Sequence, residues 1–245
     1  MSKIHRLVSW SWQKHQMSAK QLQTRGNIIK CEELRLLNGQ HEDDVIPDWD
    51  SVRRHPVLAI TGDGGTLPAD VEAFRSWKIP HDLYCVNKSM LFFQRQVDHW
   101  AAIDSEESAW FTQHVNKAIE PEKPILRHTI GYFPGAYDVW WEQVYPFTND
   151  FQRRVFIGNT GYFAVLTALH MGYEKIVLLG IPMNHEPHWY EPEAELGPNW
   201  AGLAFTQWMD LVLKFPERAA RVKSMGGYSA FILGHATRDW VLNAS

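Results

Sequence analysis

A glycine-rich turn after the first apolar run of the sequence is the first candidate for chemistry. The run PVLAIT, residues 56–61, ends in Gly62-Asp63-Gly64-Gly65-Thr66, with Pro68 shortly beyond. Backbone N–H groups in such a turn before a helix can bind a phosphate, because the helix dipole favours an anion. The turn lacks the Gly-Lys-Ser/Thr of a Walker A loop, and Pro68 replaces the last glycine of a dinucleotide-binding G-x-G-x-x-G. A strand-to-helix turn that needs glycine for positive φ is the alternative, and Asp63 could instead face a ribose hydroxyl or a base.

Further polar residues follow the other predicted strands or open a predicted helix. Lys88 could contact a phosphate while Asn87 contacts a base, although a solvated surface lysine fits the pattern equally well. Asn159 or Thr160 can cap the helix that begins after Gly158. In open α/β sheets, ligands bind outside the carboxyl ends of the strands. We therefore expect the following residues to meet the glycine-rich turn at one edge of a sheet: Asn87, Lys88, Asp104, Asn159, Thr160, Gly161 and Asn184.

The segment NHEPHWYEP, residues 184–192, contains two histidines that could exchange protons with a substrate. Either His185 or His188 could act as a general acid or base on a mobile loop that covers the substrate. The spacing of the histidines and glutamates matches no standard zinc motif, so we expect no metal site. An exposed aromatic loop without a catalytic role is the alternative.

The composition is that of an ordinary globular protein, with 245 residues, 45% apolar and 21% charged. This length fits one α/β domain, or one domain with a small appendage. The net charge of −4 disfavours nucleic acid as the main partner, because such proteins usually carry a basic excess. Two cysteines make no disulfide framework, and no stretch resembles a signal peptide or a membrane span, so we predict a cytoplasmic protein without a membrane partner. Twelve tryptophans indicate an aromatic cleft or an interface, and an interface would allow a homo-oligomer.

The elements that must position these residues are predicted from the hydrophobic pattern. We expect an N-terminal extension over residues 1–55 and the main domain over residues 56–245. Strands are predicted at 56–61, 82–87, 99–104, 124–130, 154–158 and 175–180, and helices at 68–77, 89–96, 106–119 and between GNTG (158–161) and Gly172. Residues 131–154 are aromatic and are predicted to have no regular structure. The alternation of strands and helices favours an α/β fold with a mostly parallel sheet and helices on both faces.

The order of four segments resembles a Rossmann-like superfamily of nucleotide-dependent enzymes. These segments are LAITGDGGTLP, YCVNKSMLFF, HWAAIDSEE and GNTGYFAVLTALHMGYEKIVLLGIPMN, and the resemblance covers residues 57–104 and 155–184. The superfamily includes bacterial sialyltransferases that use CMP-sialic acid, motility-associated flagellin glycosyltransferases and archaeal 6-hydroxymethyl-dihydropterin pyrophosphokinases. Short phage and prophage proteins of this type also occur. The chain departs from the family pattern at Asp63, where asparagine is usual, and at Pro182, where aspartate is usual.

The resemblance implies a nucleotide held at the carboxyl edge of the sheet. It places a phosphate or ribose near Gly62, Gly64, Gly65 and Thr66, a base or ribose near Asn87, and the nucleotide against Asn159, Thr160 and Gly161. A sialyltransferase-like enzyme also needs a base for the acceptor hydroxyl, for which His185 or His188 is the candidate. Tyr162 or Tyr190 is the candidate for a phosphate contact.

Three functions remain open from the sequence. The first is a nucleotide-sugar-dependent glycosyltransferase, with a CMP-sugar as the favoured donor and an acceptor that the sequence does not identify. The second is a pyrophosphokinase that uses ATP and Mg²⁺, for which Asp63 and Asp104 are the strand-end carboxylates. The third is a non-catalytic phage or prophage accessory protein whose nucleotide site has decayed, an alternative that Asp63 and Pro182 motivate.

Overall fold

The structure is a computed structural model that describes residues 48–93, 96–103, 125–129, 139–140, 159–184, 186–190 and 201–243. Several sequence predictions fall outside these residues. They are the helix at 106–119, the strand at 154–158, most of the N-terminal extension, and the candidate site residues Asp104 and His185. These predictions stay predictions.

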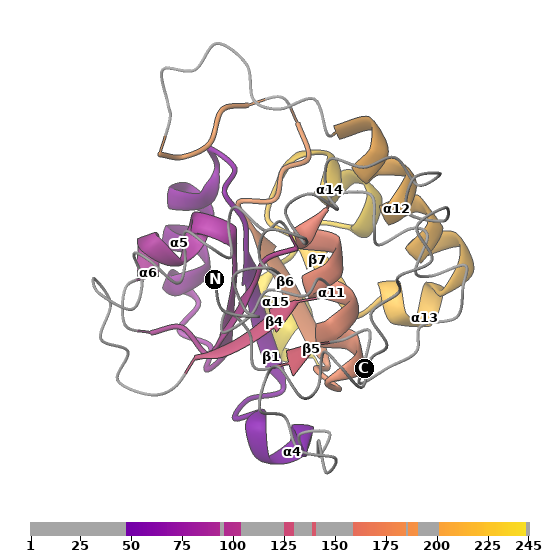
Figure 1. Cartoon of the computed structure of the whole chain (residues 1–245). Coiled ribbons are helices and arrows are strands. Elements are labelled where there is room, and N and C mark those ends of the chain that lie inside the picture. The colour runs from indigo at the N-terminus through magenta and orange to yellow at the C-terminus, as the bar shows by residue number, and fades with distance from the viewer. Residues whose placement is uncertain are drawn as a thin grey trace, which may run out of the picture.

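Among the described residues, the core is a sheet of seven parallel strands in the order β5-β4-β3-β2-β1-β6-β7 (Figure 1). The strands are β1 (Val57–Thr61), β2 (Asp82–Val86), β3 (His99–Ala101), β4 (Leu126–Thr129), β5 (Val139–Trp140), β6 (Lys175–Leu179) and β7 (Val222–Ser224). Every residue of β1, β2 and β6 is buried, as expected for parallel strands covered on both faces. The strand order and pairing confirm the predicted Rossmann-like α/β fold.

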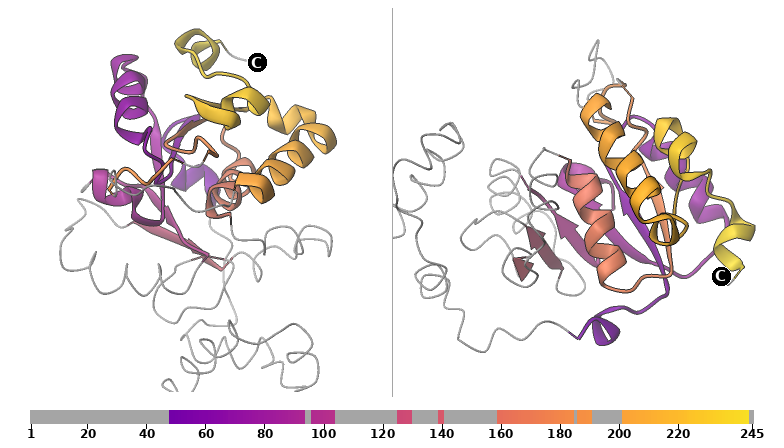
Figure 2. Two further views of the ribbon diagram at one scale, coloured as in Figure 1. Left: turned by 90° about the horizontal axis from the view of Figure 1, so that it is seen from above. Right: turned by 90° about the vertical axis from the view of Figure 1, so that its right-hand side faces the viewer.

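Helices cover both faces of the sheet (Figure 2). On one face lie α11 (Thr160–His170), α12 (Ala201–Lys214), α13 (Pro216–Ala219) and α14 (Gly227–Leu233). On the other face lie α5 (Leu67–Ser76), α6 (Met90–Phe93) and α15 (Arg238–Leu242). The short helix α4 (Trp49–Val52) precedes β1, and the 3₁₀ turn η1 (Asn87–Ser89) follows β2. In the described chain, no helix is both long and apolar enough to cross a membrane.

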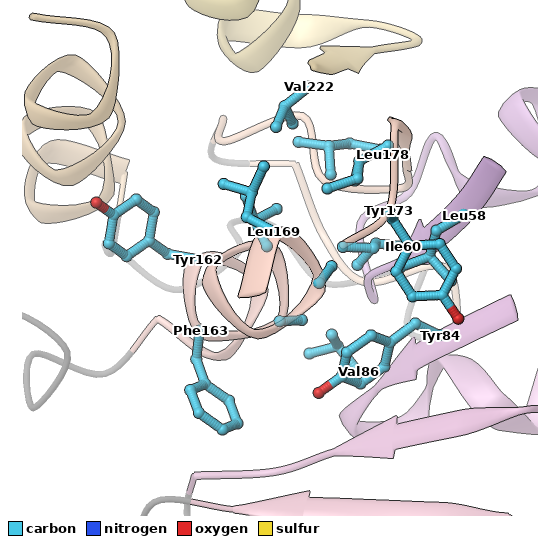
Figure 3. Packing of buried hydrophobic residues seen from close by; sticks show 14 of the residues in the cluster. Leu58, Ile60, Tyr84, Val86, Tyr162, Phe163, Leu169, Tyr173, Leu178 and Val222 are labelled. Carbon is cyan, nitrogen blue, oxygen red and sulfur yellow. The ribbon is translucent and has the colours of Figure 1, made fainter. Parts of the chain in front are cut away.

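Side chains alternate between the two faces of β1, which divides the core into two clusters. Leu58 and Ile60 face α11, whereas Val57 and Ala59 face α5. The α11 side of the core also contains Tyr84, Phe163 and further apolar residues of β6 and β7 (Figure 3). Because α11 packs between the sheet and α12, most of its residues are apolar, and all but two are buried.

The predicted elements agree with the structure best where the apolar runs are longest. The predicted helix at 68–77 is α5, and the predicted strands at 82–87 and 175–180 are β2 and β6. The prediction that residues 131–154 have no regular structure was wrong in part, because β5 pairs with β4 within this segment. β5 has only two residues, which is too short for a period-two pattern to emerge from the sequence.

Candidate functional site

The candidate site lies at the carboxyl ends of β1 and β6, where the chain changes direction across the sheet. From β1 the strands β2 to β5 follow one another outward on one side, and β6 and β7 lie on the other side. Such a switch point is where open α/β sheets bind ligands. The loops that follow the two strands are joined by hydrogen bonds from Gly62 N to Leu179 O (2.9 Å) and from Gly64 N to Gly180 O (2.8 Å).

The glycines of the turn are required by close packing. A Cβ atom on Gly62 would lie 2.6 Å from Ile181 Cγ1, and one on Gly64 would lie 2.5 Å from Pro182 Cδ. A Cβ atom on Gly65 would lie 3.0 Å from Pro187 O. None of these three glycines has a positive φ, so the alternative of a turn that needs glycine for its backbone conformation was wrong.

The start of α5 is occupied by a carboxylate of the protein itself. Asp70 Oδ2 accepts hydrogen bonds from Gly180 N and from Thr66 Oγ1, both at 2.9 Å. Burial raises the pKa of the Asp70 carboxyl above its usual value, and the two hydrogen bonds oppose this effect. Glu186 Oε2 lies 3.8 Å from the position of a Cβ on Gly65, which adds a second carboxylate. These negative charges favour a hydroxyl-bearing ligand group at the glycine-rich turn over a phosphate.

The segment Glu186–Tyr190 folds back over this turn. Gly64 and His188 form an antiparallel bridge, and Trp189 N donates to Asp63 O at 3.0 Å. The His188 and Tyr190 rings stack with centroids 5.1 Å apart, and His188 Nδ1 lies 3.2 Å from Tyr190 Oη. The structure thus places His188 and Tyr190 beside the glycine-rich turn, as a covering segment would require.

The indole of Trp189 anchors this covering segment. Its ring packs edge-to-face on Phe92 (5.5 Å) and on Tyr190 (5.5 Å). The Lys88 ammonium lies 5.3 Å from the centre of the Tyr190 ring. Asn184 stabilises the turn that leads into the covering segment, because its Oδ1 accepts a hydrogen bond from Glu186 N at 3.2 Å.

The end of β2 brings Asn87 and Lys88 to the same edge. Lys88 N donates to Asp63 Oδ2 at 3.3 Å, which joins this turn to the glycine-rich turn. Asn87 has a positive φ of 51°, and its carbonyl accepts a hydrogen bond from Trp100 Nε1 at 2.8 Å. The side-chain oxygen of Asn87 is buried and has no hydrogen-bond partner among the described residues. A buried acceptor without a donor is costly, so this oxygen is suited to a donor from a ligand.

The N-terminus of α11 is the last part of the candidate site at the carboxyl edge of the sheet. Asn159 Oδ1 accepts from Tyr162 N at 3.0 Å, which confirms the predicted cap. The position of a Cβ on Gly161 is 3.4 Å from Ile181 Cδ1, and Ile181 also contacts Gly62. The Ile181 side chain therefore lies between β1 and α11. Thr160 is buried, and the Tyr162 ring packs edge-to-face on Trp208 of α12 at 5.3 Å.

Replacing Asn159 with alanine is expected to lower the free energy of unfolding by about 1 kcal/mol, because the N–H group of Tyr162 loses its acceptor. Asn159→Asp keeps the oxygen and is expected to restore most of the loss. Urea denaturation of the two variants measures both effects. Equal losses for alanine and aspartate would show that the side chain does not act as a cap.

The start of α14, which sequence analysis missed, is hydrogen-bonded to the loop after β6. Ser229 Oγ lies 2.6 Å from Ile181 O and 2.8 Å from Ser224 Oγ, and Tyr228 N donates to Pro182 O at 2.8 Å. The pair Gly226-Gly227 was the available turn signal. The strand before it was hidden because β7 has only three residues with a lysine in the middle.

The part of the chain that the structure describes contains no group of three His, Cys, Asp or Glu side chains placed to hold a metal ion. Comparison of the sequence with models of protein families finds no match, and comparison with curated proteins finds none either. The Rossmann-like fold is therefore supported by the sheet order and the parallel pairing alone.

Proposed function

We propose that the protein binds a nucleotide at the carboxyl edge of the sheet and transfers a sugar from it, as a sialyltransferase-like glycosyltransferase would. The observation that carries the proposal is the buried Asn87 oxygen at the end of β2. An exocyclic amino group of a base is a donor of the kind that this oxygen lacks, and cytosine, adenine and guanine have one whereas uracil does not. A cytidine nucleotide agrees with the CMP-sugar expected from the sequence resemblance.

The charges around the site suggest how the donor lies. The glycine-rich turn is flanked by the carboxylates of Asp63, Asp70 and Glu186, which favour ribose or sugar hydroxyls there. The first turn of α11 has no acidic residue, so the phosphate is better accommodated on that side. The nucleobase would then lie at Asn87, and the transferred sugar would lie between the glycine-rich turn and His188.

His188 is placed to act as the base of the transfer. Its bridge to Gly64 fixes the backbone of the covering segment, and Tyr190 Oη meets its Nδ1. When Nδ1–H donates to the tyrosine oxygen, Nε2 carries the lone pair that can accept a proton. In the transfer, the acceptor hydroxyl gives its proton to Nε2 and its oxygen bonds to the anomeric carbon. The bond from that carbon to the phosphate oxygen breaks, and the nucleotide leaves with the electron pair.

A non-catalytic accessory protein is the second candidate, and a specific observation favours it. Ile181 lies between β1 and α11, and Trp189 packs beside the glycine-rich turn. A site filled by the protein's own side chains in this way would need no ligand. Movement of these two side chains on nucleotide binding separates the two candidates.

Thermal unfolding in the presence of CMP, UDP, GDP or ADP tests the proposed function. We expect CMP at 100 times its Kd to stabilise the fold by about 2.7 kcal/mol, and the other nucleotides to stabilise it less. Asn87→Gly removes the oxygen but tolerates the positive φ, so it is expected to abolish the response to CMP. Lys78→Gly is the matched control, because Lys78 also has a positive φ (55°) and follows α5 at the opposite end of the sheet. No stabilisation by any of the four nucleotides at millimolar concentration would overturn the proposal.

A further inference from the structure

A network of four buried, hydrogen-bonded polar side chains crosses the sheet, from Tyr173 and Asp82 at the amino ends of β6 and β2 to His128 near the carboxyl end of β4. Tyr173 Oη donates to Asp82 Oδ2 at 2.9 Å, and His99 Nε2 lies 3.0 Å from the same Tyr173 oxygen. His99 Nδ1 lies 3.1 Å from His128 Nε2. None of the four residues is more than 1% exposed. They come from β2, β3, β4 and the turn before β6, so the hydrogen bonds join separate parts of the chain.

The direction of the hydrogen bonds sets the protonation of the two histidines. The single proton of Tyr173 is donated to Asp82, so the tyrosine oxygen accepts from Nε2–H of His99. The Nδ1 of neutral His99 then carries a lone pair and accepts from Nε2–H of His128. The hydrogen bonds are all made when both imidazoles are neutral, and the bond between the two rings is lost when both are charged.

Asp82 connects this chain to the residues that enter β1. Its Oδ2 accepts from Arg54 N at 2.9 Å and from His55 N at 3.4 Å, and its Oδ1 pairs with Arg54 Nε at 3.4 Å. At the other end of the hydrogen-bonded network, the Trp49 ring of α4 lies 6.4 Å from the His128 ring. Residues 49–55 are therefore attached at both ends of the network.

We propose that Asp82, Tyr173, His99 and His128 form a proton-operated latch, which clamps residues 49–55 and β4 to the sheet while both histidines are neutral and releases them when the pair takes up protons. This latch is independent of the proposed transferase activity. None of its four residues belongs to the glycine-rich turn, the covering segment or the start of α11.

The geometry allows the folded pair one proton but not two. One proton can be shared along the line between His99 Nδ1 and His128 Nε2. With two protons, two N–H groups would face each other at 3.1 Å, and both charges would be buried. Opening exposes the rings to water, where each histidine binds a proton with its ordinary pKa of about 6.5.

The surroundings of His99 and His128 also disfavour protonation of the two rings in the closed latch. Burial lowers the pKa of His99 to about 4, with Asp82 opposing the effect and Arg54 adding to it. Burial and the neighbouring His99 lower the pKa of His128 well below its usual value. The Tyr84 ring lies 5.4 Å from His99 and 5.1 Å from His128 and is uncharged at these pH values, since burial raises its pKa.

Two more histidines lie near the carboxylate of Asp82. His55 donates its backbone N–H to Asp82, and the His81 side chain interacts electrostatically with both His55 and Asp82. Burial lowers the pKa of His81.

The direction of the pH dependence follows from the lowered pKa values of His99 and His128 in the closed latch. The stability of the latch is fully present above pH 6.5 and is lost as the pH falls from 6.5 toward 4.

Hydrogen exchange of the Arg54 and His55 amides, which donate to Asp82, measures latch opening. Each proton taken up on opening increases the open population up to tenfold per pH unit. After correction for the intrinsic exchange rate, we expect the open population to rise up to 100-fold per unit between pH 6 and 4.5. The increase should fall to about tenfold per unit in His128→Phe and should nearly disappear in the double variant His99→Phe/His128→Phe.

His170→Phe is the control, because burial also lowers the pKa of His170 but this residue lies on α11 outside the latch. It is expected to keep the steep pH dependence of the unmodified protein. The same dependence in the double variant as in the unmodified protein would overturn the proposal. If the variants do not fold, histidine NMR titration of the unmodified protein decides the matter. Titration of His99 and His128 near pH 6.5, with the two amides still protected, would equally overturn it.

Discussion

Gly227→Ala is expected to lower the free energy of unfolding by about 2–5 kcal/mol, a large part of the stability of a typical domain. Gly227 has a φ of +71°, where a Cβ costs about 1–2 kcal/mol. The added Cβ would lie 2.5 Å from Pro182 Cα and still closer to Pro182 O, so backbone must move, which adds about 1–3 kcal/mol. Urea denaturation followed by circular dichroism measures the change.

Gly226→Ala is the matched control for this prediction. Gly226 has extended backbone angles, and a Cβ there would meet no atom within 4 Å in the described part of the chain. The free energy of unfolding is expected to change by less than about 0.5 kcal/mol, as for an ordinary surface substitution. Similar losses in the two variants would contradict the close approach of α14 to the loop after β6.

Asp82→Asn is expected to lower the free energy of unfolding by about 2–4 kcal/mol. The carboxylate accepts from Arg54 N, His55 N and Tyr173 Oη on one oxygen and pairs with Arg54 Nε on the other. An amide of the same shape must turn its NH₂ group toward one of these sets of donors. One set is then left without an acceptor, and Arg54 loses one of the two carboxylates with which it pairs, the other being Asp98.

Asp50→Asn provides the comparison, because Asp50 also forms an ion pair with an arginine but its side chain is 82% exposed. Exposed ion pairs contribute little, so we expect a loss of at most about 0.5 kcal/mol. Denaturant unfolding at pH 7 gives both values. A loss for Asp82→Asn as small as that for Asp50→Asn would mean that Asp82 does not hold the chain entering β1.

The fold could be predicted where one strand or helix carries its own signal. β1, β2 and β6 each contain an unbroken apolar run of four residues, and α5 repeats its buried residues at helical spacing. β5 and β7 could not be predicted, because two or three residues are stabilised by their neighbours in the sheet rather than by their own pattern.

The place of the candidate site could also be predicted, because the carboxyl ends of parallel strands lie at one edge. The side-chain contacts within the site could not be predicted from the sequence. Asp70 lies in the first turn of α5, where the helix dipole favours a carboxylate, but nothing in the sequence indicates that it accepts a hydrogen bond from Gly180 N, far along the chain. His99 and His128 each sit in a short strand, and only the register of β3 with β4 brings them together.

The structure of the protein with bound CMP tests the central claim most directly. We expect the nucleotide at the carboxyl edge between the end of β2 and the start of α11. The amino group of cytosine should lie within hydrogen-bonding distance of Asn87 Oδ1, and Ile181 or Trp189 should be displaced from its position in the free protein. An edge without nucleotide at millimolar CMP, with Ile181 and Trp189 unmoved, would contradict the proposal and favour the non-catalytic candidate.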